Sequence, residues 1–285
     1  MPALANAPPD PIKAIIAAES GTGKTGSLWS LADAGFKLKI FDADRGAPIL
    51  ASILKDNPKA LANVEVCSFT DKYTRDTASG FMKPAGTPKA WSGMIDALNK
   101  WPDDPKTGIC DWGWDTVAVF DSLTMFSRRA LTYAQFLEGK GRWKPELQHY
   151  GVAMAQIEAL FGQLYGDHVK CHVLWLTHVK QEYKTTDLGD GKTQEEWVGA
   201  FPSTIGKALN AVIPRYVNDI LTVKVTGEGP NSKRYISTKP VQNRLMTKTH
   251  NINVKDQYLF ADGRTPKPGL AEFFADCGWS APNDQ

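Results

Sequence analysis

Residues 15–35, IIAAESGTGKTGSLWSLADAG, run from an apolar segment through small residues to a lysine and then into a helical pattern. Small residues allow consecutive backbone N–H groups to curl around an anion, and the helix that follows directs its positive dipole end into the same space. We therefore predict a phosphate-binding loop, called here the phosphate loop, formed by Glu19, Ser20, Gly21, Thr22, Gly23, Lys24, Thr25 and Gly26.

The flanking sequence supports this prediction. A mostly apolar run, Ile12–Ala18, reads as a buried strand, and a helix is predicted over Gly26–Ala34. Such loops usually begin with glycine, and Ala18 occupies that position here. Lys24 is expected to reach the terminal phosphates of a nucleotide, and the Thr25 hydroxyl to hold Mg²⁺. A flexible surface turn is the alternative interpretation.

Apolar runs recur along the chain with helical patterns between them. Buried strands that alternate with helices predict an α/β fold with a mostly parallel central sheet flanked by helices. Residues 220–240, ILTVKVTGEGPNSKRYISTKP, predict an antiparallel hairpin towards the C-terminus. The further predicted strands are Leu38–Asp42, Val64–Phe69, Thr116–Asp121, His172–Thr177 and Asp219–Val225, and the further helices are Pro48–Leu54, Pro88–Lys100 and 145–165.

The 285 residues are expected to form one core, residues 12–260, after a flexible N-terminal arm, 1–11, and before a short helical tail, 261–285. A net charge of +2 does not indicate any class of partner. No run approaches the length of a membrane span, and the N-terminal residues lack the basic-then-apolar order of a secretory signal. We therefore expect a cytoplasmic protein without a membrane partner.

A second motif, WDTVAVFDSLT at residues 114–124, ends an apolar run in Asp121. Its carboxylate is a candidate for holding Mg²⁺ beside Thr25, although any buried strand can end in Asp. Two predicted strands lie between the phosphate-loop helix and this strand. That number suits the ATPases in which another strand separates the phosphate-loop strand from the Mg²⁺ strand, and it argues against small-molecule kinases and GTPases.

A third motif, LKIFDADRGAP at residues 38–48, carries a candidate for the carboxylate that polarises the attacking water. Many ATPases of this class place that carboxylate directly after the Mg²⁺ aspartate, but Ser122 stands there. Strand ends at the carboxyl edge of a parallel sheet line the ligand crevice, and period-two alternation puts Asp42 and Asp44 on one side. A solvated turn with two aspartates is the alternative.

Together these motifs resemble those of RecA-like recombinases. In that family the corresponding strand ends in an Asp-Ala-Glu-like sequence whose last carboxylate activates water, and the Mg²⁺ strand ends in Asp-Ser, as Asp121 and Ser122 do here. The resemblance implies that Asp44, one methylene shorter, is catalytic. It also implies that His178, in CHVLWLTHVKQE at residues 171–182, senses the γ-phosphate, whereas a structural histidine is the alternative.

The resemblance covers residues 12–250 and is greatest to short phage-encoded RecA-like ATPases that accompany single-strand annealing proteins. It implies an ATPase that uses ATP and Mg²⁺, forms a homo-oligomer and acts on single-stranded DNA in phage recombination, repair or replication. Such a protein would work in the host cell cytoplasm, with an annealing protein as a further partner. The alternatives are a P-loop kinase of a small substrate and an ATP-switched assembly factor that neither hydrolyses ATP nor binds DNA.

Two later segments carry positive charge. RecA-like proteins place their first DNA-binding loop after the Mg²⁺ strand, where residues 128–144 read RRALTYAQFLEGKGRWK; an amphipathic helix with a solvated basic face is the alternative. The second expected loop, Val179–Ile205, is not basic. In RLMTKTHN, residues 244–251, the resemblance implies that Lys248 reaches a neighbouring subunit's γ-phosphate. The alternative interpretation is that Lys248 is an exposed lysine of the hairpin. The candidate nucleic-acid residues are Arg128, Arg129, Lys140, Arg142, Trp143 and Lys144.

Overall fold

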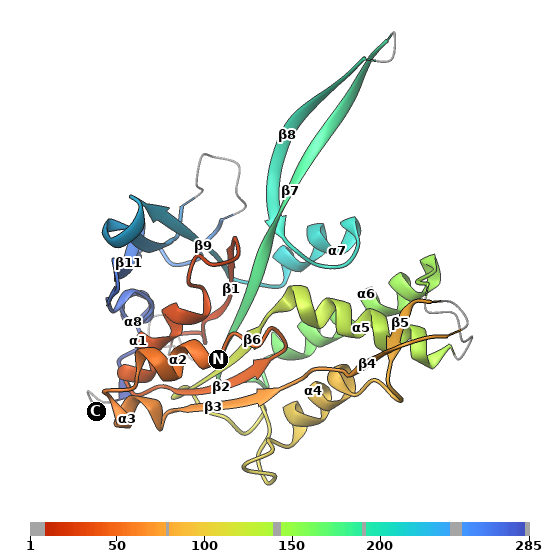
Figure 1. The fold of residues 1–285 in the computed structure, drawn as a ribbon. Helices are drawn as coiled ribbons and strands as arrows, with labels where there is room; N and C mark the ends of the chain where they lie inside the picture. Colours follow the sequence, from red (N-terminus) through yellow and green to blue (C-terminus); the bar gives the residue numbers. More distant parts are fainter. Residues whose placement is uncertain (1–8, 78–79, 139–143, 190–191, 240–246, 283–285) are drawn as a thin grey trace.

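The computed structural model describes residues 9–282 apart from 78–79, 139–143, 190–191 and 240–246 (Figure 1). Its ten-stranded sheet has the order β12-β11-β10-β9-β1-β7-β6-β2-β3, with β8 paired to β7 outside this path. The strands from β9 to β3 in this order are parallel, and β10, β11 and β12 are antiparallel. The bounds are β1 Lys13–Ala18, β2 Lys37–Asp42, β3 Val64–Ser68, β6 Thr116–Asp121, β7 His172–Gly189, β8 Lys192–Pro202, β9 Asp219–Thr226, β10 Lys233–Ser237, β11 Gln257–Asp262 and β12 Thr265–Pro266.

This arrangement confirms the predicted α/β fold with a mostly parallel sheet and an antiparallel set of strands towards the C-terminus. It also confirms that another strand, β7, separates the phosphate-loop strand β1 from β6, which ends in Asp121. In the register of the parallel strands Asp42 lies beside Asp121, and Ala18 lies beside His178. The predicted residues at these strand ends, Asp121 and His178, therefore come to one edge of the sheet, its carboxyl edge.

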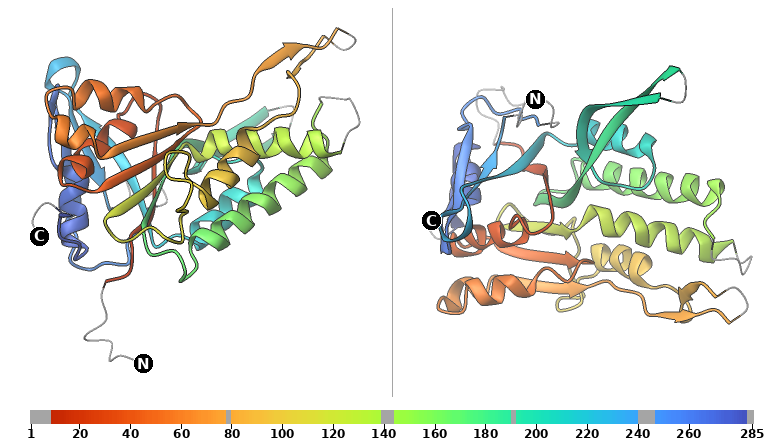
Figure 2. Two further views of the ribbon diagram at one scale, coloured as in Figure 1. Left: turned by 90° about the horizontal axis from the view of Figure 1, so that it is seen from below. Right: turned by 45° about the horizontal axis from the view of Figure 1, so that its top comes forward.

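Helices cover both faces of the sheet (Figure 2). One face packs against α4, α5 and α6, and the other against α1, α2, α3 and α8. A small separate hairpin, β4 with β5, precedes α4. The bounds are α1 Trp29–Asp33, α2 Pro48–Ile53, α3 Pro58–Leu61, β4 Tyr73–Arg75, β5 Met82–Pro84, α4 Ala90–Asn99, α5 Leu123–Leu137, α6 Leu147–Leu164, α7 Lys207–Val212 and α8 Gly269–Asp276. None of the described helices is long and apolar enough to cross a membrane.

Stacked aromatic rings fill the core on the α4–α6 face. The Phe120 ring on β6 stacks on Trp175 of β7 with ring centroids 4.1 Å apart, and Phe161 of α6 stacks on the same Trp175 at 4.9 Å. Because successive strand side chains point to opposite faces, Val117 and Val119 of β6 belong to the other core. Burying large rings at close-packed density fixes the strands that carry the site.

The strand that carries His178 is far longer than predicted. The predicted strand ends at Thr177, but β7 continues to Gly189 and pairs with β8 as an antiparallel ribbon, called here the β7–β8 ribbon. This ribbon projects from the body of the molecule (Figure 1) and replaces the predicted second loop. The ribbon carries exposed polar residues on both faces, so its sequence lacks the apolar–polar alternation that predicts a strand. Tyr183 opposite Trp197 is nevertheless a typical cross-strand aromatic pair.

Residue 260, the predicted end of the core, lies within a strand of the sheet. β11 spans that position, and β12 and α8 follow it. Leu270, Phe273 and Phe274 of α8 are completely buried, and Phe274 meets Phe36 edge to face at 5.3 Å. At the other end, most of the predicted N-terminal arm, residues 1–8, lies outside the described residues.

Candidate functional site

The phosphate loop follows β1 at the carboxyl edge of the sheet. Gly21 and Gly23 have φ angles of +77° and +99°, which only glycine adopts without strain. A Cβ atom at Gly23 would lie 3.2 Å from the Phe260 ring of β11, so the loop also approaches its neighbour closely. The Thr22 hydroxyl donates to the carbonyl of Glu19 at 2.8 Å. Local hydrogen bonding and glycine geometry together keep the loop curled.

Lys24 lies folded over this loop. Its Nζ donates to the carbonyl oxygens of Ala18 at 3.0 Å and Glu19 at 2.9 Å. Burial lowers the pKa of Lys24, and nearby carboxylates, that of Asp121 foremost, oppose this shift. Among the residues that the structure describes, the direct partners of the ammonium group are therefore backbone carbonyls, and a phosphate oxygen would be a stronger one.

Thr25 and Asp121 meet although 96 positions separate them in the chain. The Thr25 hydroxyl donates to Oδ2 of Asp121 at 2.6 Å. A Cβ atom at Gly46 would lie 2.8 Å from that same oxygen and 3.0 Å from Thr25 Oγ1. A hydroxyl and a carboxylate beside space that a methyl group would fill suit Mg²⁺, which prefers oxygen ligands. The residues present therefore fit this ion.

The electrostatics of Asp121 point the same way. Burial raises the pKa of its carboxyl to about 6, although the hydrogen bond from Thr25 opposes the shift. The carboxylates of Asp42 and Asp44 raise this pKa further. Asp121 is thus a buried acid in the company of other acids, an arrangement that a divalent cation would relieve.

Asp44 occupies the turn after β2, where two side chains bind one of its oxygens. Ser122 Oγ donates to Asp44 Oδ2 at 2.9 Å, and His178 Nε2 lies 3.2 Å from the same oxygen. The neighbouring Asp42 is buried and accepts from the backbone N–H groups of Asp44 and Gly46 at 3.0 and 3.3 Å. Asp42 therefore shapes the turn, and Asp44 faces the edge of the sheet.

The base of the β7–β8 ribbon contacts this site twice. His178 contacts Asp44 as described, and its backbone N–H donates to Thr124 Oγ1 at 3.2 Å. Gln181 Nε2 donates to Glu19 Oε1 of the phosphate loop at 3.4 Å. Two separate hydrogen bonds thus connect the ribbon to the residues expected around the nucleotide.

Lys248 lies elsewhere in the same chain. Its backbone forms an antiparallel bridge to Ile220 of β9, which is level with Ile15 of β1 and so short of the phosphate loop. Burial lowers the pKa of Lys248, and Asp219 opposes this shift. His250 Nδ1 lies 3.2 Å from Asp219 Oδ2. Lys248 is therefore not part of the constellation around its own phosphate loop.

Residues 128–144, called here the basic stretch, begin in helix α5, and a helix is the alternative interpretation of this stretch. Arg128 and Arg129 lie on α5, where Arg128 is exposed and Arg129 Nη1 donates to Tyr73 Oη at 3.2 Å. Lys144 is exposed. The other three candidates, Lys140, Arg142 and Trp143, lie outside the described residues.

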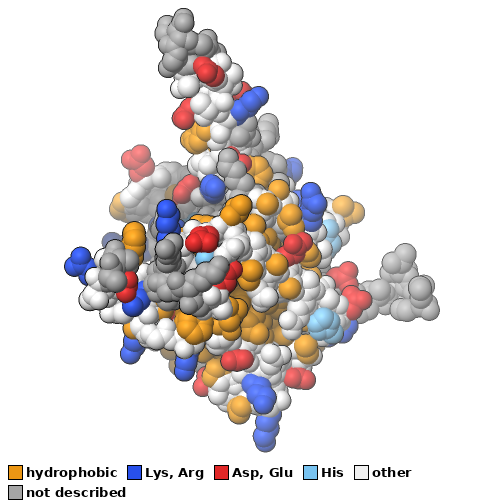
Figure 3. All heavy atoms as spheres, turned by 90° about the vertical axis from the view of Figure 1, so that its right-hand side faces the viewer, with side chains coloured by type: hydrophobic (Ala, Val, Ile, Leu, Met, Phe, Trp, Pro, Cys, Tyr) orange, Lys and Arg blue, Asp and Glu red, His pale blue; other side chains and the backbone are white. Residues whose placement is uncertain are grey.

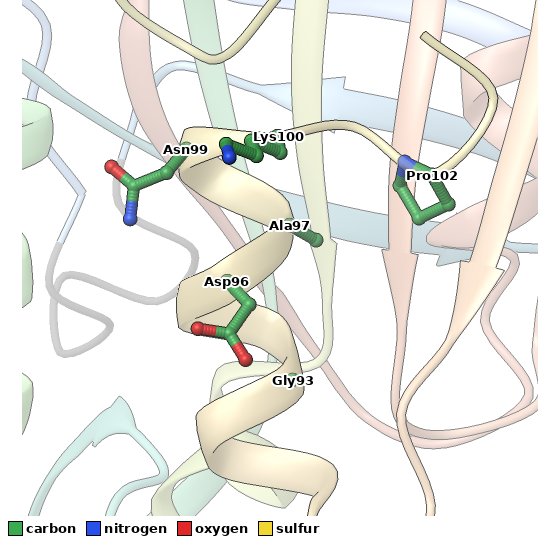
Figure 4. Close-up of a pocket in the computed structure, with 6 residues that line it drawn as sticks. All are labelled: Gly93, Asp96, Ala97, Asn99, Lys100 and Pro102. Carbon is green, nitrogen blue, oxygen red and sulfur yellow. The ribbon is translucent and has the colours of Figure 1, made fainter. Parts of the chain in front are cut away.

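Several residues at the site were not identified from the sequence. Gly46 and Ser122 lie within the quoted motifs, so the strand-end pattern places them near the site, but it does not show their contacts. Gln181 and Arg234 had no recognisable signal, because only the ribbon and the pairing of β10 bring them to the loop. A surface hollow of about 370 Å³ beside α4 (Figure 4), lined by Gly93, Asp96, Ala97, Asn99, Lys100 and Pro102, contains none of the predicted site residues.

No known protein family and no curated protein matches this sequence. Solved structures to which this chain is similar include the RadB recombinase, 12% identical over 89% of each chain with a TM-score of 0.44. Flagellar accessory protein FlaH from Methanocaldococcus jannaschii is 11% identical over 92% of this chain and 89% of its own, with a TM-score of 0.43. A KaiC-like protein from Pyrococcus horikoshii OT3 is 11% identical over 89% and 87%, with a TM-score of 0.42.

Gly46→Ala tests the space beside Thr25 and Asp121. The new methyl group would clash with both side-chain oxygens, so we expect the gain in ATP affinity on adding Mg²⁺ to fall on the order of 100-fold. Calorimetric titration with and without Mg²⁺ measures this gain. Gly151→Ala, at an exposed position of α6 with open space around it, is the matched control and should bind like the parent. Equal Mg²⁺ effects in both variants would contradict the assignment.

Asp121→Asn tests the buried charge through stability. The raised pKa means that folded Asp121 keeps its proton up to pH about 6, whereas the unfolded chain loses it near the usual 3.8. Folded-state stability therefore falls as pH rises through this window, and the penalty is complete above pH 6. Without ligand, we expect the variant to be more stable than the parent at pH 8 by up to roughly 3 kcal/mol, and the difference to vanish near pH 4. Urea unfolding at both pH values measures this; a variant less stable at pH 8 would refute it.

Proposed function

We propose that this chain is a Mg²⁺-dependent ATPase of the RecA-like class. One observation carries the proposal: Lys24 and Thr25 of the phosphate loop, Asp121 at the end of β6 and Asp44 after β2 converge at the carboxyl edge of the sheet. They come from three separate strand ends, and each supplies a group that phosphoryl transfer to water requires. The position of β7 between β1 and β6 also suits the ATPases in which another strand separates the phosphate-loop strand from the Mg²⁺ strand.

In this mechanism Lys24 exchanges its two carbonyl partners for oxygens of the terminal phosphates. Thr25 and Asp121 would hold Mg²⁺, which when bound neutralises negative charge on the phosphate oxygens. Asp44 orients the attacking water and accepts its proton. Ser122 and His178 both contact Oδ2 and so restrain the carboxylate, which leaves Oδ1 as the oxygen proposed to accept from the water.

The first experiment separates nucleotide binding from hydrolysis. Lys24→Ala should abolish turnover, and Asp44→Asn should bind ATP but hydrolyse it about 100-fold more slowly, because the water loses its base. Asp56→Asn, an exposed aspartate after α2, is the control and should match the parent. Phosphate release and calorimetric binding provide the two readouts. If folded Asp44→Asn turns over at the parent rate, the catalytic carboxylate lies elsewhere; phosphate appearing on a small acceptor would favour the kinase alternative.

We propose single-stranded DNA as the macromolecular partner, within phage recombination, repair or replication. The motif resemblance and the basic stretch support this. The face shown in Figure 3 has Lys and Arg side chains dispersed among Asp and Glu. We therefore propose that DNA contacts the basic stretch and its Trp143, and not a broad charged surface. In the homo-oligomer that the resemblance implies, Lys248 is proposed to serve the neighbouring subunit's site.

Neutralising the basic stretch tests this partner. Each lost phosphate contact should reduce the slope of log affinity against log salt by about 0.7 for a single strand. The variant replaces Arg128, Lys140, Arg142 and Lys144 by glutamine, and the charge-matched control replaces exposed Lys55, Lys59, Lys72 and Lys89. Arg129 is kept because it binds Tyr73. Fluorescence anisotropy with a labelled oligonucleotide, ATP and Mg²⁺ measures affinity. Absence of binding by the parent at low salt would favour the assembly-factor alternative.

A further inference from the structure

Arg234 lies against the phosphate loop although the two are far apart in sequence. β10 is antiparallel to β9, so that Arg234 opposes Val225, and β9 is parallel to β1 with Thr222 beside Ala17. Following β9 from Thr222 to Val225 therefore leads past the end of β1 to the level of the loop. A Cβ atom at Gly23 would lie 3.5 Å from Cδ of Arg234, which places the start of the guanidinium beside the loop backbone.

The guanidinium has unused hydrogen-bond donors. Its Nε is shielded from solvent and has no hydrogen-bond partner among the described residues. No carboxylate among these residues forms an ion pair with Arg234. The adjacent Lys233, by contrast, pairs with Asp262 at 3.6 Å. A shielded N–H without an acceptor is unfavourable, and the planar fork of arginine matches two oxygens of a phosphate. Within the described part of the chain, Arg234 thus lies unpaired beside a predicted phosphate site.

The position of Arg234 in the sheet indicates which end of the nucleotide it meets. β9 and β10 follow on one side of β1, whereas β7, β6 and β2 follow on the other (Figure 1). Asp121 and Asp44 belong to β6 and to the turn after β2. A nucleotide with its terminal phosphate at Asp44 therefore has its nucleoside end on the side of β9 and β10, where Arg234 lies.

We propose that Arg234 binds the α-phosphate of the nucleotide held by the same chain and so orients its nucleoside end. The inference rests on the proposed ATPase function and adds a binding residue to it. Phe260 supports the arrangement: it is buried beneath Gly23 and keeps the loop and the antiparallel strands in contact. Arg234 contributes binding and not chemistry, because it lies across β1 from the groups assigned to the attacking water.

Arg234→Gln and Arg234→Lys test this with ADP, which contains the α-phosphate but no γ-phosphate. We expect Arg234→Gln to raise the Kd for ADP and the KM for ATP equally, by roughly 10- to 100-fold, with kcat within about threefold of the parent. Arg234→Lys keeps the charge without the fork and should fall between. Arg264→Gln, at an exposed position between β11 and β12, is the matched control and should change neither constant. Calorimetry with Mg²⁺–ADP and steady-state hydrolysis supply the constants.

The outcomes separate this inference from the function on which it rests. An unchanged Kd for ADP in folded Arg234→Gln overturns the contact while leaving the ATPase intact. A fall in kcat with unchanged ADP binding also overturns it, because Arg234 would then act at the γ-phosphate. A parent chain that binds neither ADP nor ATP overturns the proposed function and this inference together. Parallel rises in both constants with preserved kcat support the assignment.

Discussion

The 2.6 Å hydrogen bond from Thr25 to Asp121 is the constraint on which the rest of the site depends. It joins the end of the phosphate loop to a strand that is separated from β1 by β7. Both groups must therefore be held by the sheet as a whole and not by local sequence. The stacked rings of Phe120 and Trp175 connect β6 to β7, so core packing fixes the distance at which the two oxygens meet.

The site concentrates charge that the fold alone does not neutralise. Asp121 and Asp42 are buried, Asp44 lies beside them, and the Lys24 ammonium contacts carbonyl oxygens instead of a carboxylate. Such an arrangement costs stability in the ligand-free protein, because burial and the neighbouring carboxylates raise the pKa of Asp121. Functional sites commonly carry this kind of destabilisation, and a ligand that brings Mg²⁺ and phosphate together satisfies both signs of charge at once.

How far the sequence predicted the structure depends on how local each signal is. The phosphate loop and the strands ending in Asp42 and Asp121 follow from short motifs, and the structure places them at one edge as the parallel sheet requires. The β7–β8 ribbon was missed because, beyond its base, exposed polar residues lie on both of its faces, so it lacks an apolar period. The contacts of Gly46 and Arg234 depend on residues more than 70 positions away, Asp121 and Gly23 respectively, and no local pattern encodes such pairings.

The phosphate loop is bordered by two different structures, and their difference has a functional consequence. On one side, β7 leads directly from His178 into a ribbon that also binds Glu19 through Gln181. On the other, β10 and β11 press Arg234 and the buried Phe260 against Gly23. The second side packs a buried ring against the loop, whereas the side chains of the ribbon contact the site through single hydrogen bonds between exposed or partly exposed groups. Weak polar contacts exchange partners at little free-energy cost, whereas buried rings do not. The polar contacts between the phosphate loop and the ribbon are therefore the ones that can rearrange at the lower free-energy cost.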